Sequence, residues 1–157
     1  MTDIDEALHP VLPRELTSVS GDVRVVPGPP APSVDEPYGL RIADPVADAE
    51  MVSHWMNLPH LVAAWEYPWP PQRWQRYMQA QLEGEYSRPF IGGFRGRDVA
   101  YIEIYRAAKD SIATRYDADP YDLGLHVAVA DLTLLNRGLV PLLFPKVVAS
   151  LFEVESR

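Results

Sequence analysis

The sequence has no cysteine among its 157 residues, which excludes disulfides, thiolate metal sites, iron–sulfur clusters and a cysteine nucleophile. It also lacks long apolar runs. Neither the roughly 20 residues of a membrane-spanning helix nor the basic start and apolar core of a secretory signal is present. We therefore expect a cytoplasmic protein without a membrane span.

Basic residues are scarce as well, since 14 Lys and Arg stand against 22 Asp and Glu, for a formal net charge of −8 at pH 7. This charge repels a phosphate backbone, so nucleic acid is not an expected partner. No metal site is expected, because His54 and His60 have no third candidate at ligand spacing and His9 lies near the N-terminus. P-loop, Gly-x-Ser-x-Gly and dinucleotide-binding fingerprints are absent.

Apolar residues make up 47% of the chain, which is enough for one globular core at this length. Residues 1–37 differ from the rest, because they hold seven of the 16 prolines and seven acidic residues against two arginines. The run Pro27–Pro32 has too few backbone donors for a helix or a sheet. We expect an acidic, Pro-rich tail over 1–37, either a disordered leader or a strap on the domain, and the domain itself over 38–157.

Hydrophobic spacing in 38–157 predicts a strand, two helices, a hairpin, another strand and a last helix. The predicted ranges are a strand at 38–42, helices at 46–56 and about 74–82, hairpin strands at 90–91 and 99–105, a strand at 123–130 and a helix at 137–155. Consecutive strands followed by a helix favour an α+β or mixed α/β fold with a mostly antiparallel central sheet and flanking helices.

One face of the strand at 123–130 combines a single histidine with small residues. Period two places Gly124, His126, Ala128 and Ala130 on this face and four aliphatic residues on the other. The small residues leave room for an extended ligand, and His126 is a candidate base or substrate-orienting group. A buried histidine bonded to a neighbour explains the pattern equally well.

Two aromatic-rich stretches are further candidates. Tyr101, Glu103 and Tyr105 share one face of the strand at 99–105, which suggests a site wall, although tyrosine is common in strands for packing alone. Trp65 and Trp69, in the loop before the second helix, either plug the core or line an apolar channel.

The turn Asn136-Arg137-Gly138 opens the last predicted helix, where free backbone N–H groups converge with the positive end of the helix dipole. Such a turn suits a phosphate group. The alternative is that Asn136 simply caps the helix.

Five stretches together resemble the siderophore lysine N-acyltransferases of the GNAT superfamily, most of all their mycobactin branch. They are His54-Trp-Met-Asn-Leu-Pro-His60, Ala64-Trp-Glu-Tyr-Pro-Trp-Pro70, Tyr101-Ile-Glu-Ile-Tyr105, Asp119-Pro-Tyr-Asp-Leu-Gly-Leu-His126 and Asn136-Arg-Gly138. The resemblance runs in order from about Pro32 to the end of the chain. It implies the GNAT fold and acyl transfer from a long-chain acyl thioester to the ε-amino group of lysine or N-hydroxylysine.

The resemblance also implies roles for residues. His126 would be the active-cleft histidine, and Tyr101, Glu103 and Tyr105 would line the acceptor side, with Trp65 and Trp69 as further substrate contacts. Asn136, Arg137, Gly138 and Leu139 would form the turn for the donor phosphate. The donor is then acyl-CoA or the acyl-phosphopantetheine of an acyl carrier protein, used as a substrate, and no permanently bound cofactor is expected.

Two departures from the family pattern give further expectations. Val140 and Leu142 stand where the phosphate turn of the family has small residues, which favours a carrier-protein donor over CoA. The family continues with a strand that carries a proton-accepting Asp, so the domain is expected to be C-terminally incomplete, with that Asp beyond residue 157. The unpaired edge strand would then favour self-association, and the alternative function is a non-catalytic remnant that binds an acyl carrier or a partner chain.

Overall fold

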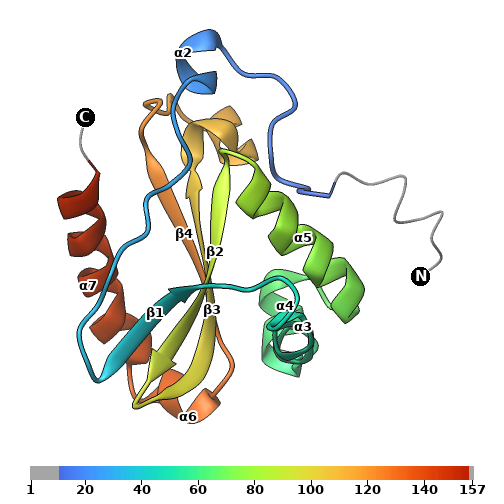
Figure 1. Cartoon of the computed structure of the whole chain (residues 1–157), viewed down its shortest axis with the longest axis vertical. Helices are drawn as coiled ribbons and strands as arrows, with labels where there is room; N and C mark the ends of the chain where they lie inside the picture. Colours follow the sequence, from blue (N-terminus) through green and yellow to red (C-terminus); the bar gives the residue numbers. More distant parts are fainter. Residues whose placement is uncertain (1–10, 156–157) are drawn as a thin grey trace.

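The computed structural model describes residues 11–155 and consists of one four-stranded antiparallel sheet between two layers of helices (Figure 1). The strand order is β1-β2-β3-β4. The strands are β1 Tyr38–Ile42, β2 Ser87–Phe94, β3 Arg97–Arg106 and β4 Leu123–Val129. The helices are α2 Gly21–Arg24, α3 Ala49–Met56, α4 Pro59–Trp65, α5 Pro71–Glu83, α6 Leu132–Asn136 and α7 Leu139–Val154, with 3-10 turns η1 Ala107–Lys109 and η2 Ser111–Thr114.

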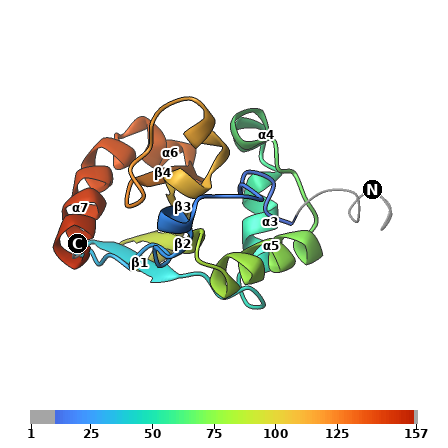
Figure 2. The ribbon, with the colours of Figure 1, turned by 90° about the horizontal axis from the view of Figure 1, so that it is seen from above.

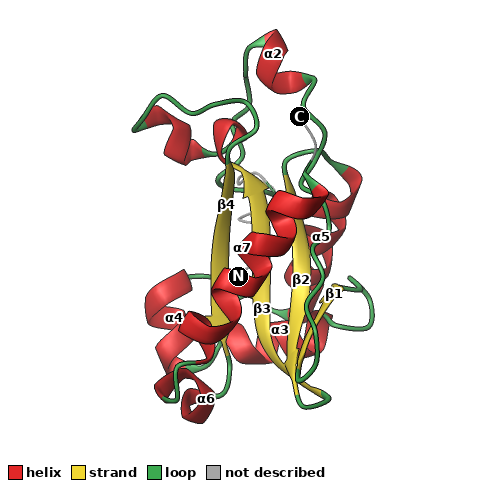
Figure 3. Ribbon diagram, turned by 90° about the vertical axis from the view of Figure 1, so that its left-hand side faces the viewer, coloured by secondary structure: helices red, strands yellow, loops and turns green. Residues whose placement is uncertain are grey.

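The two layers of helices cover opposite faces of the sheet. Helices α3, α4 and α5 pack on one face, and α7 runs across the other (Figures 2 and 3). Every strand pairing is antiparallel in residues 11–155, so the expected fold class is confirmed and the sheet is not mixed within this range. No helix in the described part of the chain is long and apolar enough to cross a membrane.

All the predicted elements are found close to their expected ranges, namely β1, α3, α5, the β2–β3 hairpin, β4 and α7. Three short helices were not predicted, namely α2, α4 and α6. Helix α4 begins at Pro59, because proline is well suited to the first turn of a helix as well as to ending the one before it. Helix α6 has five residues, too few to show a helical period.

The central strand β3 has a different kind of core on each of its faces. Ile102 and Ile104 pack toward α7 together with Phe90, Leu143 and Val147. Tyr101 and Tyr105 pack toward α3, α4 and α5. The alternation of side chains along β3 therefore separates an aliphatic core from an aromatic one.

The aromatic core fills the space between the sheet and the helices α3 to α5. Trp74 is fully buried, and its ring lies 5.1 Å from those of Trp69 and Tyr77. Tyr67 stacks on Trp69 with ring centroids 4.2 Å apart. Tyr101 joins the cluster from the sheet, 5.4 Å from Trp74. These contacts fix the position of β3 against the helices.

The turn between α6 and α7 depends on a left-handed glycine. Gly138 has φ +81°, a conformation that favours glycine, and it is the N-cap residue of α7. Asn136 is the last residue of α6, so it does not cap the final helix as the alternative interpretation held. Leu139 follows Gly138 and is buried against Val99 and Val129.

Residues 11–37 lie on the domain as a strap. Leu12 and Val26 are buried, and Glu15 forms a β-bridge with Asp110. Lys109 donates from Nζ to the carbonyl oxygen of Val26 over 2.6 Å, and Ser33 N donates to Ser150 Oγ over 2.8 Å. The strap therefore contacts both the end of β3 and helix α7, while residues 1–10 of the predicted tail lie outside the described residues.

We predict that Gly124→Ala destabilises the protein by about 1–3 kcal/mol, the usual cost of overpacking. A Cβ at Gly124 would lie 2.2–2.5 Å from the ring and hydroxyl atoms of Tyr105, which is itself packed in the aromatic core. Gly21→Ala is the matched control, because a Cβ there has no neighbour within 4 Å. Denaturant unfolding measures both variants, and equal stability of the two would contradict the contact.

Candidate active site

The candidate site centres on His126, which β4 presents to the helical layer that contains α4. Its register partner on β3 is Glu103. The ring of Tyr105 lies 4.8 Å from the imidazole, and that of Trp65, at the end of α4, lies 5.9 Å away. Arg14 of the strap completes the surroundings, with Nη1 2.8 Å from both ring nitrogens.

Glu103 is a carboxylate in the interior of the protein, with 1% of its surface exposed. Its Oε1 accepts a hydrogen bond from Arg14 Nη2 over 2.8 Å. Its Oε2 accepts from Gln81 Nε2 over 2.5 Å and from the Tyr101 hydroxyl over 2.8 Å. Burial and the nearby Glu103 charge raise the pKa of Tyr101 well above its ordinary value, so that the tyrosine is held as a donor.

The imidazole of His126 is held uncharged. Burial and, second, the positive charge of Arg14 lower its pKa to about 4, and only Asp110 acts in the opposite direction. The geometry requires the same state, because a guanidinium offers donors alone and must face an unprotonated ring nitrogen. Near neutral pH the side chain is therefore a neutral imidazole next to a buried ion pair.

The small residues beside His126 do not form the bare groove that their spacing predicts. The ring of Tyr105 occupies the space over Gly124. Ala128 is fully buried in the aromatic core, and Ala130 packs against that core. The room left by the short side chains is filled by aromatic residues from β3 and the helical layer, because a face of a sheet under helices is close-packed.

The structure brings most of the predicted substrate-side residues together. Tyr101, Glu103, Tyr105 and Trp65 all lie around His126 or its partner, and Trp65 also contacts Tyr101 at 5.7 Å between ring centroids. Trp69 does not join them. It is 5% exposed, stacks on Tyr67 and carries Arg73 over its ring at 4.0 Å, so it is a core residue.

The predicted phosphate turn lies between α6 and α7, past the C-terminal end of β4 (Figure 3). Arg137 is exposed there, and Gly138 leaves open space where a side chain would be. Leu139 and Val140, the first residues of α7, have backbone N–H groups without an acceptor within the helix. Their side chains pack in the core, so only their backbone is available to a ligand.

Sequence reasoning missed three residues that make polar contacts in or next to the candidate site. Arg14 lies in the Pro-rich segment, where no periodicity marks it, and its partner in the sheet is 112 residues away. Gln81 does carry a signal, because it is a fully buried polar residue on the apolar face of α5. His60 donates from Nε2 to the carbonyl oxygen of Val129 over 2.9 Å, which holds α4 against the end of β4.

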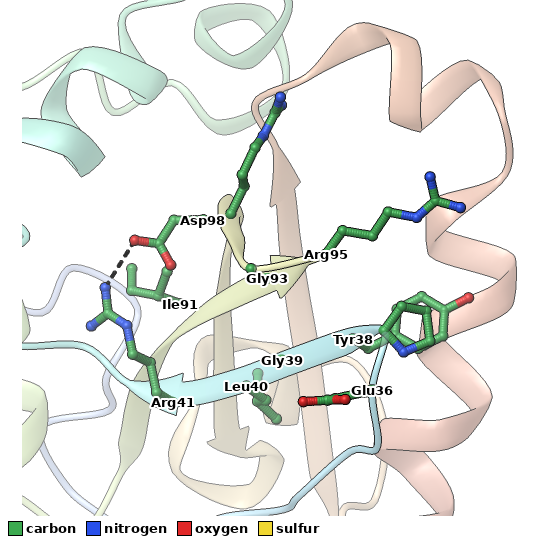
Figure 4. Close-up of a pocket in the computed structure, with 12 residues that line it drawn as sticks. Glu36, Tyr38, Gly39, Leu40, Arg41, Ile91, Gly93, Arg95 and Asp98 are labelled. Carbon is green, nitrogen blue, oxygen red and sulfur yellow. Dashed lines mark hydrogen bonds and ion pairs between the residues drawn. The ribbon is translucent and has the colours of Figure 1, made fainter.

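A hollow of about 800 Å³ lies away from His126, between β1 and the β2–β3 turn (Figure 4). Arg41 points toward Asp98 in this view, at 3.2 Å, and also pairs with Asp48 at 2.7 Å. Arg97 pairs with Asp131 at 3.4 Å. These arginines are already neutralised by carboxylates. In residues 11–155 no three potential ligands gather to hold a metal ion.

Comparison with known proteins identifies the family. The model of the acetyltransferase (GNAT) domain matches residues 44–157. A lysine N-acyltransferase MbtK from Mycobacterium sp. (strain MCS) is 68% identical over 157 residues, which are 100% of this chain and 64% of that protein. The protein of the same name from Mycobacterium tuberculosis (strain ATCC 25618 / H37Rv) is 56% identical over 93% of this chain and 69% of its own. The chain thus spans about two thirds of the length of these relatives.

More distant relatives and solved structures agree. An N(6)-hydroxylysine O-acetyltransferase from Escherichia coli is 40% identical over 64% of this chain and 32% of that protein. The aminoglycoside acetyltransferase AAC(6')-Ib in complex with coenzyme A superposes with a TM-score of 0.65 at 25% identity, over 74% of this chain and 68% of that chain. An uncharacterized protein from Bacillus halodurans shares the fold, with a TM-score of 0.71 at 22% identity over 83% of this chain and 69% of that chain. The chain therefore belongs to the GNAT acetyltransferase family.

Proposed function

We propose that the protein is an N-acyltransferase that moves an acyl group from a thioester to the side-chain amine of lysine or N6-hydroxylysine in siderophore assembly, as in mycobactin. The relatives named lysine N-acyltransferase MbtK and N(6)-hydroxylysine O-acetyltransferase support this substrate class. The observation that carries the proposal is the neutral imidazole of His126 next to the buried Glu103, on adjacent strands of a GNAT sheet.

The chemistry of the transfer fits an uncharged imidazole. The amine nitrogen forms a bond to the carbonyl carbon, the carbon–sulfur bond breaks, the nitrogen loses a proton and the departing thiolate gains one. Because its unprotonated nitrogen faces Arg14, a neutral His126 has its ring N–H left to donate a hydrogen bond, which can orient the carbonyl group of the thioester near neutral pH. Tyr105 and Trp65 supply aromatic walls that orient the acceptor beside it.

The donor end of the site is assigned to the start of α7. The free N–H groups of Leu139 and Val140, the open Gly138 and the exposed Arg137 suit a phosphate or diphosphate. AAC(6')-Ib, a structural neighbour, is described in complex with coenzyme A, which supports a CoA thioester. An acyl carrier protein presents the same phosphopantetheine thioester, so both donors belong to the proposal.

We predict that His126→Ala lowers kcat/KM for lysine acylation by about 10²-fold, the low end for a positioned acid–base or hydrogen-bonding group. His54→Ala is the matched control, because His54 is exposed on α3. Steady-state release of the thiol from the acyl thioester measures both. A His126 variant with unchanged kinetics and unchanged thermal unfolding would remove this residue from the site.

We predict that Arg137→Gln weakens binding of a CoA donor by about tenfold, the value of one charge-assisted hydrogen bond of about 1.4 kcal/mol. The variant should raise KM for the donor and leave kcat near its original value. Arg115→Gln, another exposed arginine, serves as the control. Equal donor dissociation constants for the two variants would show that the phosphate lies elsewhere.

The alternative function, binding of a carrier or partner chain without turnover, has one structural feature in its favour. Helix α7 exposes Leu142, Phe144 and Phe152, the last of them to 80%. Next to them, Leu125 of β4 lines an apolar hollow of about 660 Å³. Since β4 pairs only with β3 in residues 11–155, its outer edge and this surface are available to a second copy of the chain or to another protein.

We predict that the protein self-associates through this surface, so that its sedimentation coefficient rises with concentration. Phe152→Glu should reduce the association by placing a charge in the contact. Val46→Glu is the control, because Val46 is 72% exposed next to α3, on the other side of the sheet. A monomer at all concentrations would contradict the prediction, as would equal effects of the two substitutions.

A further inference from the structure

Arg14 occupies a fixed position on the domain. Its carbonyl oxygen accepts a hydrogen bond from Ser111 N over 2.8 Å, and Leu16 N donates to the carbonyl oxygen of Lys109 over 2.9 Å. Between these two bonds Glu15 forms the β-bridge with Asp110. The backbone on both sides of Arg14 is thus tied to the segment that follows β3, and its side chain starts from a defined point.

The guanidinium of Arg14 connects two groups of the candidate site. Nη1 lies 2.8 Å from both ring nitrogens of His126, and Nη2 donates to Glu103 Oε1 over 2.8 Å. Its central carbon lies 5.5 Å from the centroid of the Tyr105 ring. A planar fork of donors can hold an imidazole and a carboxylate in one fixed arrangement, which the single ammonium of a lysine cannot do.

Arg14 lies outside residues 44–157, the range that the GNAT domain model matches. The contacts to β3 and β4 span 89 and 112 residues of sequence. The N-terminal strap therefore completes the site, although it lies outside the range that the GNAT domain model matches.

We propose that Arg14 is a positioning residue of the acyl-transfer site, whose guanidinium fixes the imidazole of His126 against Glu103. The expected effect on turnover rests on the proposed function, whereas the contact of Arg14 with His126 and Glu103 is independent of that function. Arg14 acts through His126 and makes no bond that the acyl transfer forms or breaks.

The charges around His126 determine the expected sign. Glu103 and Tyr105 face it from β3, Asp110 acts on it from the end of η1, and Trp65 of α4 is uncharged. Arg14 is the positive group that lowers the pKa of His126, after burial, while Asp110 raises it. Removing the guanidinium leaves the carboxylates unopposed and admits water, so the pKa must rise.

The test compares Arg14→Gln with Arg24→Gln, which changes an exposed arginine of the same strap. The titration of the His126 ring is followed by NMR from pH 3 to 8. In the unchanged protein and in Arg24→Gln the ring stays neutral until the pH approaches 4. We expect the pKa in Arg14→Gln to rise by about one unit or more. An unchanged titration of His126 would overturn the proposal.

Kinetics of the same variants distinguish two roles of Arg14, namely positioning of His126 and occupation of the place of the substrate amine. Arg14→Gln should lower kcat by about tenfold with little change in KM for the donor, because a displaced imidazole affects the chemical step. If Arg14 instead merely occupied the place of the substrate amine, its loss would lower KM for the acceptor and raise turnover. That result would also overturn the proposal.

Arg14→Lys covers the case in which Arg14→Gln does not fold. It keeps a positive charge for Glu103 but cannot reach both groups, so His126 should keep a low pKa while kcat falls. A Lys variant with the original kcat would contradict the bridging role. If the unchanged protein shows no acyl transfer, the proposed function fails, whereas the NMR titration still decides whether Arg14 controls His126.

Discussion

A carboxylate buried in the central strand is the constraint on which the rest of the site depends. Glu103 is almost fully removed from water, and such a charge is very costly unless other groups bond to it. Donors to it come from three parts of the chain, among them Arg14 of the strap, Gln81 of α5 and Tyr101 of β3 itself. The strap and α5 must therefore lie against the sheet at positions from which Arg14 and Gln81 can donate hydrogen bonds to Glu103.

The same constraint explains the state of His126. Because Arg14 is held by Glu103, its remaining donors face the imidazole and disfavour a second positive charge there. The aromatic rings of Tyr105 and Trp65 exclude water from the pair. Burial and, second, the ion pair of Arg14 with Glu103 therefore lower the pKa of His126, so that stability and the proposed function depend on the same contacts.

Period-two reasoning was sufficient to place Tyr101, Glu103 and Tyr105 on one face of β3 and His126 on the matching face of β4. It was not sufficient to show what fills that face, because the residues that pack there come from other elements. Trp69 illustrates the limit, since an aromatic residue before a helix has the same local pattern in a channel wall as in a core. Arg14 has no local pattern at all, and its proposed role follows only from contacts across 89 and 112 residues of sequence.

The β-bridge between Glu15 and Asp110 has a consequence for the order of assembly. The strap leaves the ribosome before the sheet does, but its binding surface includes Asp110, and the partner of Arg14 on β4 is His126. The contact of Arg14 with His126 closes a loop of 112 residues, and the contacts of the finished sheet offset the entropic cost of this closure. During synthesis the strap therefore remains unpaired until nearly the whole sheet has emerged. His126 acquires its final environment in one of the last steps of folding.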